Sequence, residues 1–322
     1  MIEVDPSVLA KPENEDYASS GYDTSTASLT SSLNEYVVEN GRRYHSYYGT
    51  EKYLMPTDEK EQDRLDLHHE IFRLVWSDKL HSAPLAEPHR ILDVGTGTGI
   101  WAMEIAEQYP MAEVVGTDIS PIQPCWVPPN CRFEIDDAMQ EWTFKDDNFD
   151  FIHARNISSG VSDWGHLISE MKRCTAPGGY VELCEKSLVI QCDDGTMKPD
   201  HGIKVFTEYL RDAMRKMGRP CPDLAFLKNL LETAGFEEVT TSQAKEPVGP
   251  WPKDPRLKRA GAMNLLNAET GFESYGMALF TRILGMDVDK ARKICEKGLM
   301  DTRNKNYHVY DTGLRVYGKK PA

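Results

Sequence analysis

The sequence predicts an α/β protein built on a doubly wound, mainly parallel sheet, with helical segments added before the sheet and inserted into it. A short apolar run at 90–94 ends in a glycine loop that leads into a helical pattern, and strand patterns then alternate with helical ones up to residue 250. Acidic residues follow three of these strands in succession. Because strands that alternate with helices are joined by right-handed crossovers, the sheet should be mainly parallel.

The composition is typical of a globular protein that acts on something other than nucleic acid. The chain has 322 residues, of which 40% are hydrophobic and 27% are charged. Its formal charge of −14, without a Lys/Arg-rich stripe, would repel a phosphate backbone. No apolar run reaches the roughly eighteen residues of a membrane helix, and no basic-then-apolar leader begins the sequence. We therefore expect no nucleic acid or membrane partner, and a cytoplasmic or nuclear location.

The residue types that bind metals are not arranged for that purpose. The seven cysteines form no CxxC pair and have no histidine at zinc-finger spacing, which favours reduced structural thiols. The acidic pair Asp193 and Asp194 precedes Gly195-Thr196, a sequence typical of a turn. We expect no metal.

Two segments precede the sheet. Residues 1–34 are rich in Ser, Thr, Asp and Glu and poor in periodic apolar positions, which predicts a disordered tail. Residues 35–85 are expected to form an N-terminal helical segment over the cofactor site, because apolar residues approximate helical spacing between 59 and 76.

The α/β core is expected to span residues 86–250. The strand 90–94, the loop Gly95–Gly99 and the helix 100–108 are the opening of a nucleotide-binding βα unit. Further strands are expected at 113–117, 131–135, 149–154, 180–184 and around 238–242, with helices at 162–175, 203–217 and 223–234.

The C-terminal part completes the core after an insertion. The segment 251–301 has a helical pattern and is too long for a simple connection, so we expect a helical cap over the site. Residues 302–322 should return to the sheet as a pair of strands, 307–310 and 313–318.

The glycine loop differs from the dinucleotide-binding pattern. It reads Asp93-x-Gly95-x-Gly97-x-Gly99, with its last glycine one residue too early for GxGxxG. Glycines allow the backbone to approach a ligand closely, and an acidic residue at the end of the first strand can hold the ammonium group of a methionine moiety. This combination suits S-adenosylmethionine, which has no phosphate.

Acidic residues at the ends of the next two strands support the same ligand. Asp118 lies nineteen residues after Gly99, where a carboxylate can accept hydrogen bonds from both ribose hydroxyls. Asp136-Asp137-Ala138 follows the third strand, beside the expected adenine site. Ligands of such sheets bind at the carboxyl ends of the strands, so the pattern predicts a methyltransferase that uses S-adenosylmethionine and releases S-adenosylhomocysteine.

These residues resemble the class I S-adenosylmethionine-dependent methyltransferases and, within them, the fungal LaeA-like methyltransferases. The resemblance covers roughly residues 35–320 and includes longer blocks at 118–124, 126–130, 133–137, 149–155, 177–182 and 249–254. It implies a Rossmann-like sheet of seven strands, one of them antiparallel. It also implies that Tyr53, Arg64 and His68 lie over the donor, and that Arg155, Asn156 and Ile157 border its methyl group. The cofactor-binding residues expected in all are Asp93, Gly95, Thr96, Gly97, Gly99, Asp118, Ile119, Asp136, Asp137, Ala138, Arg155, Asn156, Tyr53 and Arg64.

Methyl transfer is an in-line displacement at a sulfonium, for which the protein mainly has to place a nucleophile about 3 Å from the methyl carbon. A hydroxyl acceptor would benefit from a general base, and the candidates are His153, His69 and Glu185. His153 lies in an expected strand, which favours a core histidine, and His68 and His69 can equally be a surface pair.

Four tryptophans are the candidates for the wall of an acceptor pocket, although tryptophans are more often core residues. They are Trp126, Trp142, Trp164 and Trp251.

The expected function is transfer of a methyl group to an O, N or S nucleophile, most simply on a small secondary metabolite. The alternative that the resemblance implies is a regulator of secondary metabolism that acts through a protein partner in a nuclear complex. A third possibility is that the protein has this fold but catalyses other chemistry, such as a cyclisation, because fold alone does not fix function.

Overall fold

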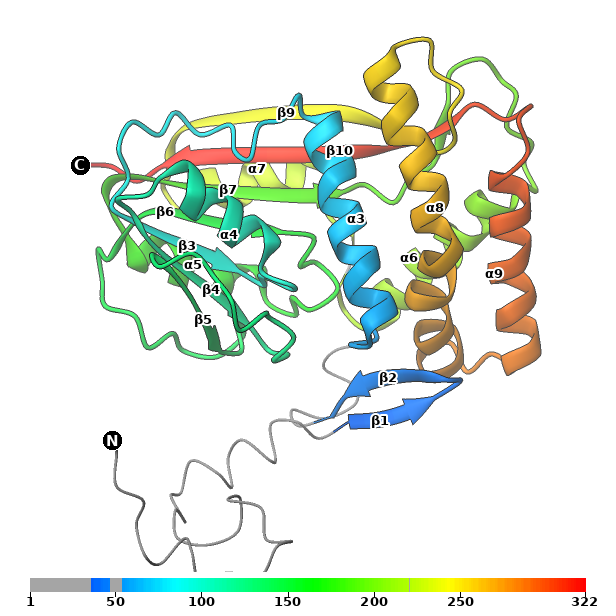
Figure 1. Ribbon diagram of the computed structural model, residues 1–322, viewed down its shortest axis with the longest axis horizontal. Coiled ribbons are helices and arrows are strands. Elements are labelled where there is room, and N and C mark those ends of the chain that lie inside the picture. Colours follow the sequence, from blue (N-terminus) through cyan, green and yellow to red (C-terminus); the bar gives the residue numbers. More distant parts are fainter. Residues whose placement is uncertain (1–35, 47–53, 220) are drawn as a thin grey trace, which may run out of the picture.

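The computed structural model describes residues 36–46, 54–219 and 221–322 (Figure 1). The expected tail at 1–34 and the candidate Tyr53 lie outside these residues. The helices are α3 (Glu59–Val75), α4 (Ile100–Gln108), α5 (Trp164–Cys174), α6 (Gly202–Lys216), α7 (Leu224–Thr233), α8 (Pro255–Ala278) with the π-helical turn η1 (Leu279–Ile283), and α9 (Val288–Thr302). The strands are β1 (Tyr36–Glu39), β2 (Arg42–His45), β3 (Arg90–Val94), β4 (Glu113–Asp118), β5 (Cys131–Ile135), β6 (Phe149–Arg155), β7 (Thr175–Lys186), β8 (Gln191–Cys192), β9 (Glu237–Pro247) and β10 (Val309–Lys319).

The central sheet has the expected doubly wound topology. Its strands lie in the order β5-β4-β3-β6-β7-β10, and β9 pairs with the far side of β10. The pairs from β5 to β7 are parallel, whereas β10 runs antiparallel to both β7 and β9. This confirms a seven-stranded sheet with one reversed strand, to which the two-residue strand β8 adds a short pairing with β10.

Helices cover both faces of the sheet because successive residues of the central strands point to opposite sides. On one face, Leu92 and Val94 of β3 pack in a cluster with residues of α5 and α7. On the other face, Ile91 packs against Trp101 of α4. Both faces are therefore apolar, as expected for a parallel sheet.

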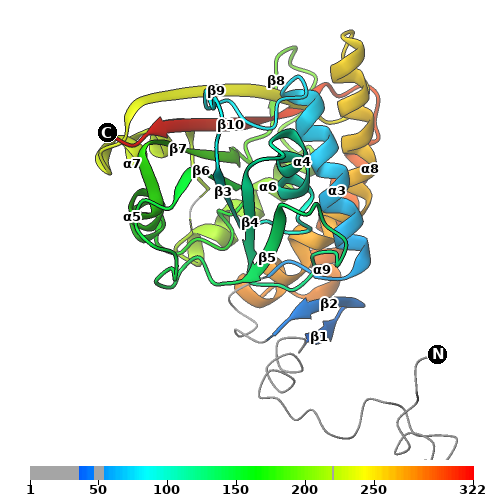
Figure 2. The same ribbon diagram turned by 60° about the vertical axis from the view of Figure 1, so that its left-hand side comes forward.

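The remaining helices form a separate wall at one side of the sheet. In Figures 1 and 2, α3, α8 and α9 stand side by side there, with α6 behind them and the β1–β2 hairpin at one end. Helix α3 packs on α8, and α9 packs on α6 and α8. The expected insertion at 251–301 corresponds to α8, η1 and most of α9. Among the described helices, none has both the length and the hydropathy needed to cross a bilayer.

The N-terminal segment is not wholly helical. Helix α3 begins at Glu59 as expected, but a β-hairpin precedes it. Its turn residues Asn40 and Gly41 have φ values of 51° and 76°. Asn-Gly is the preferred pair for a two-residue hairpin turn because both positions need positive φ. This Asn-Gly turn signal is present in the sequence. The prediction that residues 35–85 form helices alone was therefore wrong for the hairpin.

The C-terminal residues form one strand rather than two. Asp311 and Thr312, which separate the two expected strands, pair with Glu246 and Lys245 of β9. Both side chains are buried, at 4% and 8% exposure. Because β10 has partners on both sides, its backbone groups are satisfied without a turn.

Candidate functional site

A cavity of about 350 Å³ lies between the carboxyl ends of the parallel strands and helix α3. It brings together most of the residues expected to bind the cofactor, namely Asp93, Gly95, Thr96, Gly97, Asp118, Ile119, Asp136, Asp137, Ala138, Arg155, Asn156 and Arg64. Gly99 is not part of the lining; it precedes α4 as its N-cap. The size is within the range of cofactor sites in proteins.

The three glycines of the loop share a positive φ but differ in the space around them. All three have positive φ, at 69° for Gly95, 59° for Gly97 and 82° for Gly99. A Cβ at Gly95 would lie 2.5 Å from Ile157, and one at Gly99 would lie 2.2 Å from the ring of Phe133. At Gly97 the nearest such atom is 3.8 Å away, so the loop leaves open space on the cavity side there. A ligand can approach the backbone at Gly97.

Asp118 is held at the end of β4 by two backbone N–H groups. Gly97 donates to its Oδ2 at 2.8 Å, and Ser120 donates to its Oδ1 at 2.9 Å. Burial nevertheless raises the pKa of this carboxyl to about 6. The fixed carboxylate retains free lone pairs toward the cavity, which is what ribose hydroxyls require.

Asp93 joins the glycine loop to the core of the sheet. Thr96 Oγ1 donates to its Oδ2 at 2.6 Å, and His153 Nδ1 donates to its Oδ1 at 2.7 Å. The imidazole of His153 is fully buried and stacks on Trp101, with 3.8 Å between the ring centroids. Among the described residues, His153 is not part of the cavity lining. It therefore supports Asp93 from behind, and its position corrects the proposal that it contacts an acceptor as a base.

The far end of the cavity is formed by the loop after β5. Asp137 is buried, and its Oδ1 accepts the N–H of Met139 at 3.0 Å. Arg219, which follows α6, lines the same end and donates to the carbonyl of Ser159 at 2.8 Å. No local pattern in the sequence marked Arg219, because it reaches the cavity from the segment after α6, far along the chain from the strand ends.

Helix α3 contributes one face to the cavity. The four residues Glu61, Arg64, Leu65 and His68 all line it, at the i, i+3, i+4, i+7 spacing of a single helical stripe. This spacing could have been recognised from the sequence. His69 lies on the adjacent face, where its Nε2 donates to Glu104 at 3.0 Å. Both histidines are buried, so the surface-pair reading was wrong.

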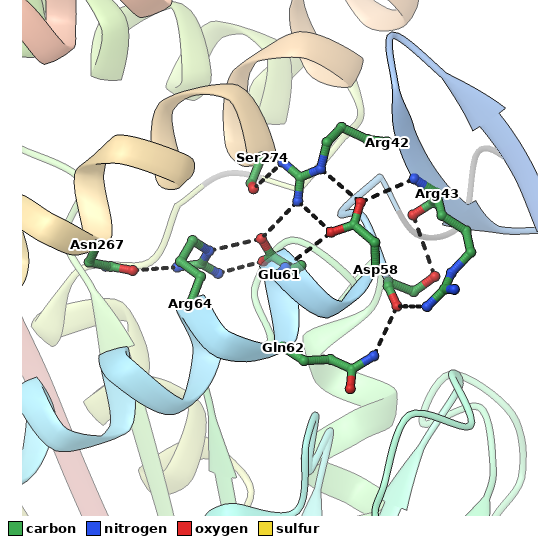
Figure 3. A network of polar contacts seen from close by, with 9 residues as sticks. Arg42, Arg43, Asp58, Glu61, Gln62, Arg64, Asn267 and Ser274 are labelled. Atoms are coloured by element: carbon green, nitrogen blue, oxygen red, sulfur yellow. Dashed lines mark hydrogen bonds and ion pairs between the residues drawn. The ribbon is translucent and has the colours of Figure 1, made fainter.

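A network of charged side chains fixes this face of α3 (Figure 3). Arg64 donates from Nε and Nη2 to the two carboxylate oxygens of Glu61, at 2.9 and 2.6 Å. Arg42 of the hairpin donates to both carboxylate oxygens of Asp58, the N-cap of α3, at 2.7 and 2.8 Å, and from Nη1 to Ser274 of α8 at 2.9 Å. The hairpin and α8 therefore hold the cavity-facing carboxylate and guanidinium in place.

A second, smaller cavity of about 60 Å³ adjoins the first. The two share the lining residues Met55, Asn156, Ser159 and Tyr275. The rest of the smaller cavity is mainly apolar, with Leu54, Leu188, Leu210, Met214, Met217 and Leu279, and its charged groups are Glu185 and Lys186. Tyr275 comes from α8, so the insertion contributes to both cavities.

Of the three candidate bases, Glu185 is the one that lines a cavity. Its Oε1 accepts the N–H of Ile157 at 2.9 Å, which fixes the loop after β6. Burial raises the pKa of this carboxyl to about 7. His69 instead accepts from Arg155 at its Nδ1, at 3.1 Å, and lies outside both cavities as the structure describes them.

The tryptophans do not form an acceptor pocket within the described residues. Trp142 and Trp164 belong to the apolar core beside α5 and α7. Trp126 is 93% exposed, and the indole N–H of Trp251 donates to the carbonyl of Val309 at 3.1 Å. The prediction that these tryptophans are core residues is therefore confirmed for Trp142 and Trp164.

The acidic pair Asp193 and Asp194, considered above as metal ligands, bonds to protein side chains. Asp193 forms an ion pair with Lys245, and Asp194 accepts from Thr196 at 2.8 Å and from His308.

The geometry suits a donor with a ribose and a positively charged sulfur. Asp118 and the open backbone at Gly97 both line the cavity, together with acidic groups at the ends of three strands. A cluster of carboxylates in a buried site attracts a cation and would repel a phosphate.

Comparisons with known proteins agree with this geometry. A family model described as a methyltransferase domain matches residues 67–241. The chain is 40% identical over 303 residues to methyltransferase pytC of Aspergillus terreus, covering 93% of this chain and 92% of that protein. It is 36% identical over 285 residues to the secondary metabolism regulator LAE1 of Cochliobolus heterostrophus, covering 86% and 92%.

A solved structure shows the same fold. It is a methyltransferase from an antibiotic biosynthesis pathway of Anabaena variabilis, with a TM-score of 0.50 and 15% identity, and the match covers 79% of this chain and 96% of that one. Together with the family model and the relatives, the site identifies the chain as a member of the class I S-adenosylmethionine-dependent methyltransferases, among the fungal LaeA-like proteins.

Proposed function

We propose that this methyltransferase acts on an oxygen, nitrogen or sulfur nucleophile of a small secondary metabolite. The observation that carries the proposal is the apolar second cavity, which shares four lining residues with the donor cavity. Its mainly apolar lining with a few polar groups is typical of small-molecule sites, and its volume of about 60 Å³ would hold one part of an acceptor, with the rest in the adjoining donor cavity. An acceptor held there would have its nucleophile beside the donor.

The donor cavity offers a place for each part of S-adenosylmethionine. The ribose would bind Asp118, the adenine would lie by Asp136 to Ala138, and the methionine part would extend toward Asp93 and Arg64. Asn156 would then border the methyl group, because it lines both cavities. The bound donor supplies an activated methyl group, so the protein's main contribution is to align the nucleophile and exclude water.

Calorimetric titration with S-adenosylmethionine and S-adenosylhomocysteine tests the donor site. Asp118→Ala should weaken both ligands at least about tenfold, because it removes hydrogen bonds to a charged acceptor that contribute about 1.5–3 kcal/mol each. Glu107→Ala, at an exposed position of α4, is the matched control and should bind like the wild type. Absence of binding to the folded wild type would refute the proposal.

Filling the second cavity tests the acceptor site. Met217 lines this cavity and not the donor cavity, so Met217→Trp should abolish transfer of labelled methyl groups to small molecules of a fungal extract. S-adenosylhomocysteine binding should remain within about threefold of the wild type, since the donor contacts are unchanged. Undiminished transfer would place the acceptor elsewhere.

The names of several relatives support a second candidate function. LAE1 and laeA proteins, 33–36% identical to this chain, are named secondary metabolism regulators. On this reading the chain would act through a protein partner in a nuclear complex. Labelled methyl groups that appear on protein and not on small molecules would favour this function, and Met217→Trp would then have little effect.

A further inference from the structure

The junction of the two cavities is where a methyl group would pass from donor to acceptor, an argument that rests on the proposed function. Asn156 belongs to both cavities, and its side-chain amide contacts His68 of α3, with Nδ2 3.4 Å from Nδ1. His68 also lines the donor cavity. Its imidazole therefore lies at the junction with Nδ1 directed toward Asn156.

The opposite edge of the same imidazole faces a carboxylate. His68 Nε2 lies 3.7 Å from Oε1 of Glu246 in β9, a distance for an ion pair and longer than a hydrogen bond. Glu246 is 3% exposed and is fixed by two donors, Lys186 Nζ at 2.6 Å and Asn264 Nδ2 at 3.0 Å. An imidazole with one nitrogen toward a ligand site and the other toward a fixed carboxylate is the arrangement of a general base and its orienting acid.

We propose that His68 is a catalytic residue that accepts the proton of the acceptor at Nδ1, and that Glu246 is the positioning residue that keeps the hydrogen of neutral His68 on Nε2. In this step the acceptor's lone pair forms the bond to the methyl carbon, and the carbon–sulfur bond breaks with its electron pair going to sulfur. The acceptor's proton moves to Nδ1. The positive charge of the sulfonium is thereby replaced by that of the imidazolium, so the net charge of the site is unchanged.

The charges around His68 keep its imidazole unprotonated before the reaction. Burial, together with the nearby Lys186, lowers the pKa of His68 to about 4, so the free imidazole is neutral at pH 7. Burial opposes ionisation of Glu246, but the charge of Lys186 outweighs it and holds the pKa of Glu246 below its ordinary range.

Charged and titratable groups surround this dyad from several elements. They are Arg64 on α3, Lys186 on β7, Tyr275 on α8 and Asp311 on β10.

The other candidate bases are less well placed. His69 is absent from the lining of both cavities as described, and Glu104 and Arg155 hold its two nitrogens. Glu185 lines the second cavity but not the donor cavity, and its carboxylate accepts the backbone N–H of Ile157. Glu185 can orient an acceptor there, whereas His68 lies at the boundary with the donor.

The tautomer of His68 tests the proposal directly. Nitrogen NMR of the ¹⁵N-histidine-labelled full chain, saturated with S-adenosylhomocysteine, should show neutral His68 with its hydrogen on Nε2 at pH 7. His68→Gln assigns the signals. Glu246→Gln should shift the His68 nitrogens toward a mixture of tautomers, because the amide lacks the carboxylate charge that favours the hydrogen on Nε2 and can itself donate to that nitrogen.

A matched control uses the neighbouring pair. Glu104→Gln should change the signals of His69 and leave those of His68 unchanged, since Glu104 contacts His69. A hydrogen on Nδ1, a cationic His68 at pH 7, or a His68 signal that does not respond to Glu246→Gln would each overturn the proposal. The wild-type spectrum decides the tautomer even if Glu246→Gln does not fold. Calorimetry with S-adenosylhomocysteine tests the donor site separately, so the two failures are distinguishable.

Discussion

The two walls of the donor cavity are built in different ways. The sheet wall consists of strand ends and one loop, and its side chains bond to adjacent parts of that wall, as Asp118 does to Gly97 of the glycine loop. The helical wall consists of α3, whose charged face is held by distant parts of the chain. Arg42 and Ser274, which bond to each other beside it, are 232 positions apart in the sequence.

This difference predicts how each wall responds to mutation. The sheet wall depends on positive φ at a few glycines, and at Gly95 and Gly99 it has no room for an added Cβ. The helical wall depends on buried charges that neutralise one another. Because removal of one partner leaves the other buried and unpaired, that wall should be the more sensitive to loss of a single charge.

Arg42→Met should cause the largest loss, about 3–5 kcal/mol in the free energy of unfolding, because it leaves the carboxylate of Asp58 without its counterion. Glu61 loses a second, more distant cation but keeps Arg64. Urea unfolding measures the loss in stability. Arg43→Met is the matched control, since the partner of Arg43 is Glu59, whose side chain is 79% exposed. Its effect should stay below about 1 kcal/mol. Similar losses in the two variants would contradict the difference between the walls.

Gly99→Ala and Gly97→Ala separate packing from ligand approach in the sheet wall. Gly99→Ala should cost about 2–4 kcal/mol, because an αL conformation is combined with a clash against Phe133. Gly97→Ala should cost only about 1–2 kcal/mol, the αL term alone, and yet weaken S-adenosylhomocysteine binding. Thermal melts and calorimetry measure the two effects. A stable Gly99→Ala protein would show that the loop can shift away from Phe133.

Glu185→Gln should change how stability depends on pH. Burial raises the pKa of Glu185 from 4.5 to about 7, so between these values the folded state binds more protons than the unfolded state and stability falls as pH rises. Removing the carboxyl should make the protein more stable by roughly 1–3 kcal/mol at about pH 8, with little effect near pH 4. Glu107→Gln at an exposed position is the control. An unchanged pH slope of the melting temperature would contradict this prediction.

The smallest expected effect concerns donor affinity at low pH. The pKa of Asp118 is raised to about 6 by burial, and a ligand that donates hydrogen bonds to it prefers the ionised form. Affinity for S-adenosylhomocysteine should therefore fall below about pH 6, by up to tenfold for each further unit. Asp118→Asn should bind more weakly than the wild type but lose this pH dependence. Calorimetry at about pH 5 and about pH 7.5 provides the comparison.

The sequence predicted the sheet wall better than the helical wall. Asp93, Gly97 and Asp118 were recognised because strand, glycine loop and acidic strand end are neighbours in the chain. The partnership of His68 and Glu246 was not, because residues on a helix and a strand 178 positions apart carry no shared local pattern. The hairpin was also not predicted, although its Asn40-Gly41 turn is a local signal in the sequence.

The sequence by itself determined the fold class, the order of most strands and the loop that approaches the donor. The reason is that apolar periodicity and the need for positive φ are properties of a few consecutive residues. The resemblance implied that His68 lies over the donor, but only the tertiary structure showed that His68 lines the cavity while the adjacent His69 bonds to Glu104 outside it. Adjacent residues on a helix point about 100° apart, so that choice depends on how α3 is rotated about its axis. The contacts of Arg42 with Asp58 and Ser274, and of Arg64 with Asn267, fix that rotation from distant parts of the chain.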